Sequence, residues 1–496
     1  MLQVWKDQRR WPATDNTPAF LGLSAGGGLW DQGITGEDVV IGVIDTGIWP
    51  EHPSFSDQED LSDRPGESGK RTRAYGPPPD DWYGGCQSGE QISQDDCNNK
   101  LVGIKYFKDG FTNHEVNISG DYLSGRDADG HGTHTASTAG GNAGVTAEIF
   151  GIPRGTVSGM APRARIAAYK VCWADAGCWS SDSAAAVDQA VADGVDAINF
   201  SIGVGASLLA ADDIAFLFAA DAGVYVATSA GNSGPDPYTV GAPASVPWIT
   251  GVGASTHSRA FISDITLSGP ATPPGGIWGG SVTPGVDTYN LVDAEGIADV
   301  EDDTSGMCLN PFPPGTFMPD DAVLCNQYDF GVARMERVAN VAAGGGGAVL
   351  FHNSAAVSMT PTDNHVLPTV HMLNDVGQQL KDYLVANPGA VTVSFTAGQA
   401  QYSPADPRVK PTVMASFSSR GPNPAAEDLI KPDVTAPGVS ILAGNSPVPF
   451  LGAQGQLFQA IMGTSMSSPH VAGLFALLKE AHPDWSAAEA KSALMT

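Results

Sequence analysis

The chain has 496 residues and a formal net charge of −29, because 54 Asp and Glu outnumber 25 Lys and Arg. Its length exceeds the roughly 250–300 residues that one hydrophobic core serves, so we expect more than one folded unit. A hydrophobic content of 42% excludes a disordered chain, and the acidic excess argues against nucleic-acid binding, which needs clustered Lys and Arg.

An α/β pattern fills the first half of the chain. Residues 38–45 form a nearly continuous β-branched run, which is typical of a strand buried on both faces of a parallel sheet. Ala-rich helical segments alternate with further runs of this kind. The predicted strands are 38–45, 166–171, 197–201 and 224–228, and the predicted helices are 180–192 and 208–222. This alternation implies right-handed crossovers and a doubly wound α/β sheet.

The α/β pattern breaks near Ser268 and gives way to Gly/Pro-rich loops with short β-like runs at 348–351 and 391–395. One helix is predicted over 331–343, ended by four glycines. We interpret 276–400 as a smaller, β-rich inserted domain, flanked by the two parts of an α/β domain at 14–275 and 401–496. The second part ends in helices at 465–481 and 486–496; because the last helix has no stop signal, we expect the sequence to end inside a larger protein.

The six cysteines fall into three close pairs, Cys86/Cys97, Cys172/Cys178 and Cys308/Cys325. An even count in local pairs favours three short-loop disulfides and an oxidising compartment. The alternatives are zinc ligation, although no pair has the usual two-residue spacing, and six reduced thiols. No apolar run of signal-peptide or membrane-spanning length is present, so we expect any export signal to lie outside this sequence.

Ser465 lies in Gly-Thr-Ser-Met-Ser-Ser-Pro-His, between Gly463 and a proline that suits the first turn of a helix. A serine at a helix N-terminus has N–H groups nearby that favour a developing oxyanion. On its own, such a serine-rich turn more often only caps a helix. Asn232, in Ser-Ala-Gly-Asn-Ser-Gly-Pro after the 224–228 strand, can donate from its amide to an oxyanion or can be a plain turn residue.

His131 lies between two glycines in Asp-Ala-Asp-Gly-His-Gly-Thr-His, a sequence that starts a helix with Asp129 as a candidate cap. Two metal-binding alternatives are weak. His131 and His134 lack the Glu of the usual zinc helix, and a calcium loop would need a Glu where Thr138 stands.

Asp45 ends the first strand, in Ile-Asp-Thr-Gly, where a carboxylate can orient His131 and stabilise its cation. Asp-Thr-Gly is also the signature of aspartic proteases, which need two carboxylates that share a proton. The chain has no second Asp-Thr-Gly or Asp-Ser-Gly, which argues against a single-chain aspartic protease.

Together these four segments resemble the subtilisin-like serine proteases, whose catalytic residues follow the same order, Asp…His…Ser. The resemblance implies Asp45, His131 and Ser465 as the triad and Asn232 as the oxyanion donor. It also implies that Ser201, Ile202 and Gly203 hold the substrate as an added strand.

Further segments resemble the plant cucumisin-type branch of that family: 82–100, Tyr-Lys-Val-Cys-Trp at 169–173, and Phe-Ser-Ser-Arg-Gly-Pro at 417–422. Members of this branch carry a protease-associated domain between the oxyanion Asn and the nucleophile, the interval in which 276–400 falls. Residues 14–23 resemble the mature start in this branch, so 1–13 would be a propeptide remnant. The resemblance implies secretion, protein or peptide substrates, and inhibition by the protein's own propeptide. It implies no cofactor; many subtilases bind calcium, but no loop here requires it.

Two functions follow from the sequence. The first is a secreted serine endopeptidase that acts through an acyl-enzyme and loses activity on acidification as His131 protonates, near pH ~6.5 unless the His131 pKa is shifted. The second is a catalytically silent binding protein on the same scaffold, whose usual sign, loss of a triad or oxyanion residue, is absent.

Overall fold

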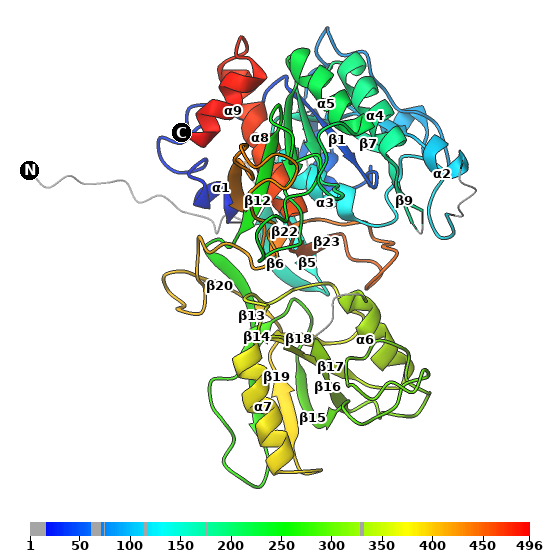
Figure 1. Cartoon of the computed structure of the whole chain (residues 1–496), viewed down its shortest axis with the longest axis vertical. Coiled ribbons are helices and arrows are strands. Elements are labelled where there is room, and N and C mark those ends of the chain that lie inside the picture. The colour runs from blue at the N-terminus through cyan, green and yellow to red at the C-terminus, as the bar shows by residue number, and fades with distance from the viewer. Residues whose placement is uncertain (1–15, 61–70, 74, 114–117, 175, 328–331) are drawn as a thin grey trace, which may run out of the picture.

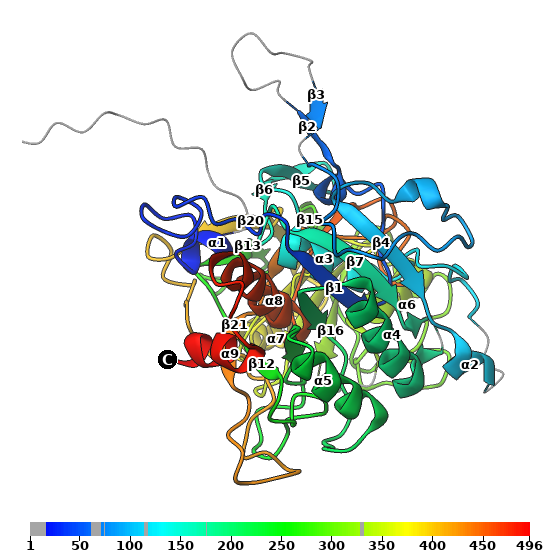
Figure 2. The same cartoon turned by 90° about the horizontal axis from the view of Figure 1, so that it is seen from above.

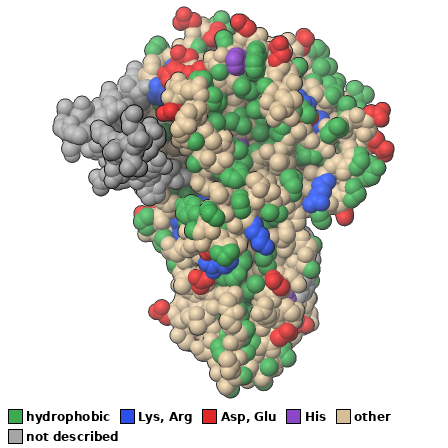
Figure 3. Space-filling view, turned by 90° about the vertical axis from the view of Figure 1, so that its left-hand side faces the viewer, with side chains coloured by type: hydrophobic (Ala, Val, Ile, Leu, Met, Phe, Trp, Pro, Cys, Tyr) green, Lys and Arg blue, Asp and Glu red, His purple; other side chains and the backbone are tan. Residues whose placement is uncertain are grey.

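The computed structural model describes residues 16–60, 71–73, 75–113, 118–174, 176–327 and 332–496. The predicted propeptide remnant at 1–13 lies outside these residues. Figure 1 shows an α/β unit with a second, smaller unit below it. On the face in Figure 3, acidic side chains are scattered over both units, in keeping with the net charge.

The α/β unit is built on a sheet of seven strands, all parallel, in the order β21-β12-β11-β10-β1-β7-β4. The strands are β1 (Val40–Asp45), β4 (Leu101–Tyr106), β7 (Arg165–Lys170), β10 (Ala197–Phe200), β11 (Tyr225–Ser229), β12 (Thr250–Ser255) and β21 (Val434–Pro437). The predicted doubly wound α/β sheet is confirmed.

Helices cover both faces of this sheet, which explains why its strands read as continuous apolar runs. In β1, Ile41 and Val43 face the core shared with α3 (His131–Gly140) and α8 (Thr464–Ala481). Val40 and Ile44 face the opposite core, under α4 (Ser180–Asp193) and α5 (Ala211–Asp221). Successive side chains of a strand point to opposite faces, so a strand between two helical layers needs apolar residues at every position. The helices α4 and α5 lie side by side in both views (Figures 1 and 2).

Shorter elements complete the α/β unit. They are α1 (Thr17–Phe20), α2 (Asp109–Asn113), α9 (Ala487–Met495) and the hairpins β2 (Gln58–Asp60) with β3 (Arg71–Arg73), β5 (Val145–Ile149) with β6 (Ile152–Val157), β8 (Cys172–Trp173) with β9 (Gly177–Cys178), and β22 (Ile441–Gly444) with β23 (Phe458–Ile461). No helix among the described residues is both long and apolar enough to cross a membrane.

The second unit has its own sheet of eight strands, in the order β14-β18-β17-β16-β15-β19-β13-β20, with β13 also pairing to β14. Its elements are β13 (Arg259–Ser268), β14 (Trp278–Gly280), β15 (Val286–Asp293), β16 (Asp321–Gln327), β17 (Ala348–Asn353), β18 (Thr369–Met372), β19 (Thr392–Phe395), β20 (Gln399–Tyr402), α6 (Arg334–Ala343) and α7 (Asn374–Ala386). Strands β15 to β18 are parallel to one another, and β13, β14, β19 and β20 pair antiparallel.

This second sheet begins earlier than the boundary predicted at residue 276. Its first strand, β13, alternates buried and exposed side chains along 264–268, the pattern of a strand with one face in water. The helix α7 was also not predicted from the sequence; it packs Leu380 and Leu384 against the sheet. The helix predicted over 331–343 is observed as α6, from Arg334.

All three close cysteine pairs are joined as disulfides, Cys86–Cys97, Cys172–Cys178 and Cys308–Cys325. The third lies inside the second unit, where both of its cysteines are buried in a core with Phe351 and Val338.

The two units meet across an apolar and hydrogen-bonded junction. Phe261 and Val282 of the second unit pack with residues of the β5–β6 and β22–β23 hairpins. Between β17 and β18, Thr362 donates to the carbonyl of Ala460 at 2.7 Å, and the Asn364 amide donates to the carbonyl of Phe458 at 2.8 Å. These bonds fix the 354–368 connection against the strand that leads into α8.

Candidate active site

Asp45 and His131 form a direct hydrogen-bonded pair. Asp45 is 1% exposed at the carboxyl end of β1, and its Oδ1 accepts from His131 Nδ1 at 2.7 Å. The same oxygen accepts from the backbone N–H of Thr46 at 2.7 Å, and Oδ2 accepts from the Thr135 hydroxyl at 3.1 Å. With its lone pairs engaged on both oxygens, the carboxylate is held in one orientation and fixes the imidazole.

Glycines allow the helix that carries His131 to start directly against the end of β1. Gly130 has φ 101°, a left-handed conformation that most side chains avoid. A Cβ on Gly132 would stand 2.2 Å from the carbonyl oxygen of Gly47, so any larger residue there would push α3 away from the strand. The flanking glycines of the His131 motif are therefore required by close backbone approach.

Asp127, which is fully buried, ties the strand end and the helix start together. Its Oδ1 accepts from the Thr46 hydroxyl at 3.0 Å and from the N–H groups of Asp129 and Gly130 at 3.0 and 2.9 Å. Its Oδ2 accepts from Thr133 N–H at 2.9 Å and from the Thr133 hydroxyl at 2.6 Å. Because N–H and O–H donors occupy both oxygens, this loop does not fit a calcium site.

The pKa of His131 rises from 6.5 to about 9. Burial of the ring opposes this rise, but the charge and hydrogen bond of Asp45 and the further negative charges of Asp129 and Asp127 outweigh burial. The imidazolium is thus strongly stabilised, which is useful for a group that must accept a proton during a reaction.

Ser465 lies in the first turn of α8, where backbone N–H groups have no partner within the helix. Its hydroxyl donates to the carbonyl of Ser201 at 3.1 Å, and the Ser201 hydroxyl donates back to the carbonyl of Ser465 at 2.9 Å. Asn199 supports this contact: its amide donates to Ser201 Oγ at 3.1 Å, and its Oδ1 accepts from the Ser468 hydroxyl at 2.8 Å. Among the described residues, no hydrogen bond joins Ser465 to His131.

Strand register nevertheless brings the two halves of the predicted triad to one place. The neighbouring strands β1 and β10 pair Ile44 with Phe200, so Asp45 and Ser201 are the next residues at the same edge. Adjacent strands lie ≈ 4.8 Å apart. His131 is bonded to Asp45 and Ser465 to Ser201, so both side chains gather at the carboxyl edge of the sheet, where α/β proteins bind ligands.

The orientation of Asn232 is fixed by Thr464. Both the backbone N–H and the hydroxyl of Thr464 donate to Asn232 Oδ1, each at 2.9 Å. Since a backbone N–H can only donate, the amide oxygen must face Thr464, and Nδ2 is left as a donor beside the start of α8. Asn232 is exposed, so this donor is open to a ligand.

A cavity of ≈ 780 Å³ adjoins Ser465, and we call it the nucleophile cavity. Ser201, Gly203 and Asn232 share its wall with Ser465, and the rest of its lining is uncharged, including Val204, Tyr238 and Ala242. Val204 exchanges backbone hydrogen bonds with Ala242, at 3.1 and 3.0 Å, which braces the segment that follows Gly203. Ile202 does not line this cavity; it packs with the core beneath the sheet.

One cluster in the described residues has metal-ligand chemistry, namely Asp363, His365 and His371 in the second unit, all buried. It does not fit a metal well, because Arg334 already binds both carboxylate oxygens of Asp363, at 2.5 and 3.0 Å. The two histidines instead contact each other, Nε2 to Nε2 at 2.8 Å, and neither Nδ1 has the acceptor that orients most metal-bound imidazoles.

Sequence reasoning missed Asp127 and Thr464 as positioning residues. Asp127 belongs to the Asp-x-Asp-Gly segment, which was considered only as a calcium loop and was a weak alternative, because carboxylates at loop starts look alike in sequence. Thr464 directly precedes Ser465, and only its contact with Asn232, far away in the chain, shows what it does.

Comparisons with known proteins identify the family to which the chain belongs. The sequence profile of the Subtilase family matches residues 36–496. Over the whole chain it is 40% identical to Subtilisin-like protease SBT1.4 of Arabidopsis thaliana, and over 97% of the chain 40% identical to SBT1.3 of the same plant. The chain spans 62% and 60% of these two proteins. Among solved structures, a cold-adapted subtilisin-like serine proteinase matches 93% of this chain and 82% of its own, with 17% identity and a TM-score of 0.40.

Proposed function

The chain belongs to the subtilase family, and on that premise we propose that it is a secreted serine endopeptidase with Asp45, His131 and Ser465 as its triad. The observation that carries the proposal is the 2.7 Å bond between Asp45 and His131, next to a serine held at the neighbouring strand end. The three disulfides support an oxidising compartment.

The reaction follows from these positions. Rotation of the Ser465 O–H away from Ser201 directs its proton to His131 Nε2 while Oγ attacks the peptide carbonyl. The carbonyl π electrons move onto oxygen, and the oxyanion accepts from Asn232 Nδ2 and from the Ser465 N–H. His131 then protonates the leaving amine, the C–N bond breaks, and an acyl-enzyme remains. Water, deprotonated by His131, attacks this ester; the Oγ–acyl bond breaks, and the proton returns to Ser465.

The substrate is held as an extended strand along Ser201–Gly203, with the side chain of the acyl residue in the nucleophile cavity. Because no charged residue lines this cavity, we expect a bulky uncharged side chain there. We assign the second unit to the protease-associated domain of the cucumisin-type branch, since it lies between Asn232 and Ser465 in the chain. We keep inhibition by the protein's own propeptide as a further part of this proposal.

A fluorophosphonate probe, which modifies only activated serines, tests the triad. We expect labelling of the wild type and of Ser181→Ala, which alters a serine in the first turn of another helix, α4. Ser465→Ala should be unlabelled and should not cleave casein. A folded wild type that is neither labelled nor able to cleave casein would favour the silent binding protein instead.

A further inference from the structure

A second cavity, of ≈ 280 Å³, lies between the two units and has a wall from each. Asn232, Phe417 and Met462 come from the α/β unit; Gln327, Val357 and Met359 come from the inserted one. We call it the junction cavity. Its lining also includes Arg334, whose guanidinium is bound by Asp363, so most of the accessible wall is apolar.

The junction cavity and the nucleophile cavity share one residue that the proposed reaction uses. Asn232 lines both, whereas Ser465, Ser201 and Gly203 line only the nucleophile cavity. When the carbonyl oxygen of a bound peptide accepts a hydrogen bond from Asn232, the nucleophile cavity therefore lies on one side of that oxygen and the junction cavity on the other.

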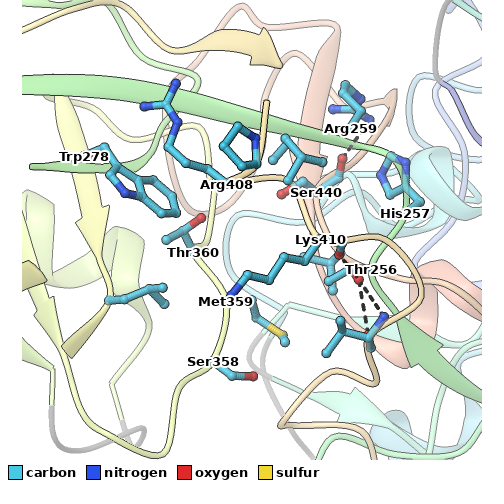
Figure 4. Close-up of a pocket in the computed structure, with 16 residues that line it drawn as sticks. Thr256, His257, Arg259, Trp278, Ser358, Met359, Thr360, Arg408, Lys410 and Ser440 are labelled. Atoms are coloured by element: carbon cyan, nitrogen blue, oxygen red, sulfur yellow. Dashed lines mark hydrogen bonds between the residues drawn. The ribbon is translucent and has the colours of Figure 1, made fainter. Parts of the chain in front are cut away.

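The part of this wall that comes from the inserted unit is held in place by packing and by hydrogen bonds. Met359 is 6% exposed and packs with Ala254, Ala415 and Val439 of the α/β unit. The nearby bonds of Thr362 and Asn364 to β23 fix the rest of the connection. Figure 4 shows Ser358, Met359 and Thr360 at a different cavity, which they line together with Lys410 and Trp278.

Gln327, a residue that lines the junction cavity, has a buried side-chain acceptor without a partner among the described residues. Gln327 is 2% exposed at the end of β16, and its Oε1 accepts no hydrogen bond among the described residues. An unpaired buried amide oxygen costs free energy unless a ligand supplies a donor. An extended peptide brings such donors in its backbone N–H groups.

We propose that the inserted unit forms a specificity subsite in the junction cavity, which takes a bulky apolar side chain from the leaving-group side of the scissile bond. This inference rests on the proposed function. The acyl residue must place its carbonyl at both Ser465 and Asn232, so its side chain enters the cavity that both line. The junction cavity, which lacks Ser465, then receives one of the first two residues after the scissile bond, with Gln327 accepting an N–H.

Two substrate sets test the subsite. The first is internally quenched peptides with Leu or Gly at each of the first two positions after the cleaved bond. The second is a methyl ester of the same acyl peptide, which has no leaving-group residue. For the wild type we expect kcat/KM to be about tenfold higher with Leu than with Gly at one of these positions, the effect of a filled apolar pocket.

Val357→Trp should fill the cavity and abolish the preference for Leu, while leaving methyl ester hydrolysis unchanged. Val366→Trp, in the same connection but exposed and outside the cavity, should keep the preference. Gln327→Leu should lower kcat/KM for the peptides about tenfold and leave the ester unaffected.

A preference for Leu that survives Val357→Trp in a protein with a wild-type melting temperature would overturn the inference, as would an equal loss with the methyl ester. A wild type that hydrolyses the ester but shows no preference at either position also overturns it, and the proposed function stands. A wild type inert toward ester and peptides, and unlabelled by fluorophosphonate, overturns the proposed function and this inference with it.

Discussion

At the scale of single residues, the protonation of His131 decides when the candidate triad can work. The base must be neutral to accept the Ser465 proton, yet Asp45 and its acidic neighbours stabilise the cation and raise the pKa of His131 to about 9. We therefore expect activity to fall on acidification at a higher pH than the ~6.5 expected for an ordinary histidine.

We predict that kcat/KM for a neutral peptide rises with pH through a midpoint near 9. Asp129→Asn removes one negative charge near the ring and should shift the midpoint to lower pH. A pH–rate profile of both proteins gives the two midpoints. A wild-type midpoint at or below pH ~6.5 would contradict the stabilising effect of the carboxylates.

Asn232 is predicted to act only in the transition state. Asn232→Asp keeps the shape but replaces the Nδ2 donor with an acceptor, so kcat should fall by about 10²–10³ with little change in KM; the magnitude comes from a member of this family. Steady-state kinetics separates the two constants. A raised KM with unchanged kcat would instead make Asn232 a binding residue in the ground state.

At the scale of elements, the site depends on how β1 and α3 are joined. Asp127 accepts five hydrogen bonds from the turn after β1, from the loop before α3 and from the first turn of α3. A buried carboxylate with this many donors sets the distance between Asp45 and His131, although it touches neither side chain.

Asp127→Asn should lower the free energy of unfolding by about 2–3 kcal/mol, because an amide NH₂ group would face N–H and O–H donors of a buried site. Urea denaturation followed by Trp fluorescence measures the change. Asp129→Asn, two residues away and exposed, is the comparison variant and should change stability by less than Asp127→Asn does. Equal effects of the two variants would show that the Asp127 network adds no stability.

At the scale of the whole molecule, buried histidines link stability to pH. Burial lowers the pKa of His52, His365 and His470 to about 4 and that of His134 to about 3. These groups take up protons on unfolding between their folded values and the unfolded ~6.5, so they stabilise the fold above ~6.5 and lose this contribution as pH falls toward 4. His131 has the opposite sign: its contribution is complete below ~6.5 and is lost as pH rises through about 9.

We predict that the free energy of unfolding falls between pH ~6.5 and 4, with a slope of up to about 1.4 kcal/mol per pH unit for each such histidine. His52→Gln removes one group that takes up a proton on unfolding, so it should lower the slope by up to about 1.4 kcal/mol per pH unit. The ring of His52 is 1% exposed and packs against Phe55 and Phe458. Denaturation midpoints across this pH range give the slopes. A stability that does not change on acidification would contradict burial of neutral rings.

The sequence by itself determined the parts of this protein that depend on local order. The apolar run that ends at Asp45, the glycines around His131 and the helix start at Ser465 are each written in a few consecutive residues, so the strands, the helices and the candidate site residues could be predicted. The three disulfides could be predicted for the same reason, because each joins two cysteines that lie close together in the sequence.

Only the tertiary structure decided what these residues contact. The Asp45–His131 bond, the amide orientation of Asn232 and the place of Asp127 depend on segments that meet after folding. The first strand of the second unit was assigned to the α/β unit, because local composition does not show which sheet a strand joins. The α7 helix was missed although its buried residues Val376, Leu380 and Leu384 have helical spacing. The wall formed by Val357, Met359 and Gln327 beside Asn232 was equally hidden, since it joins residues of two cores that have no shared sequence pattern.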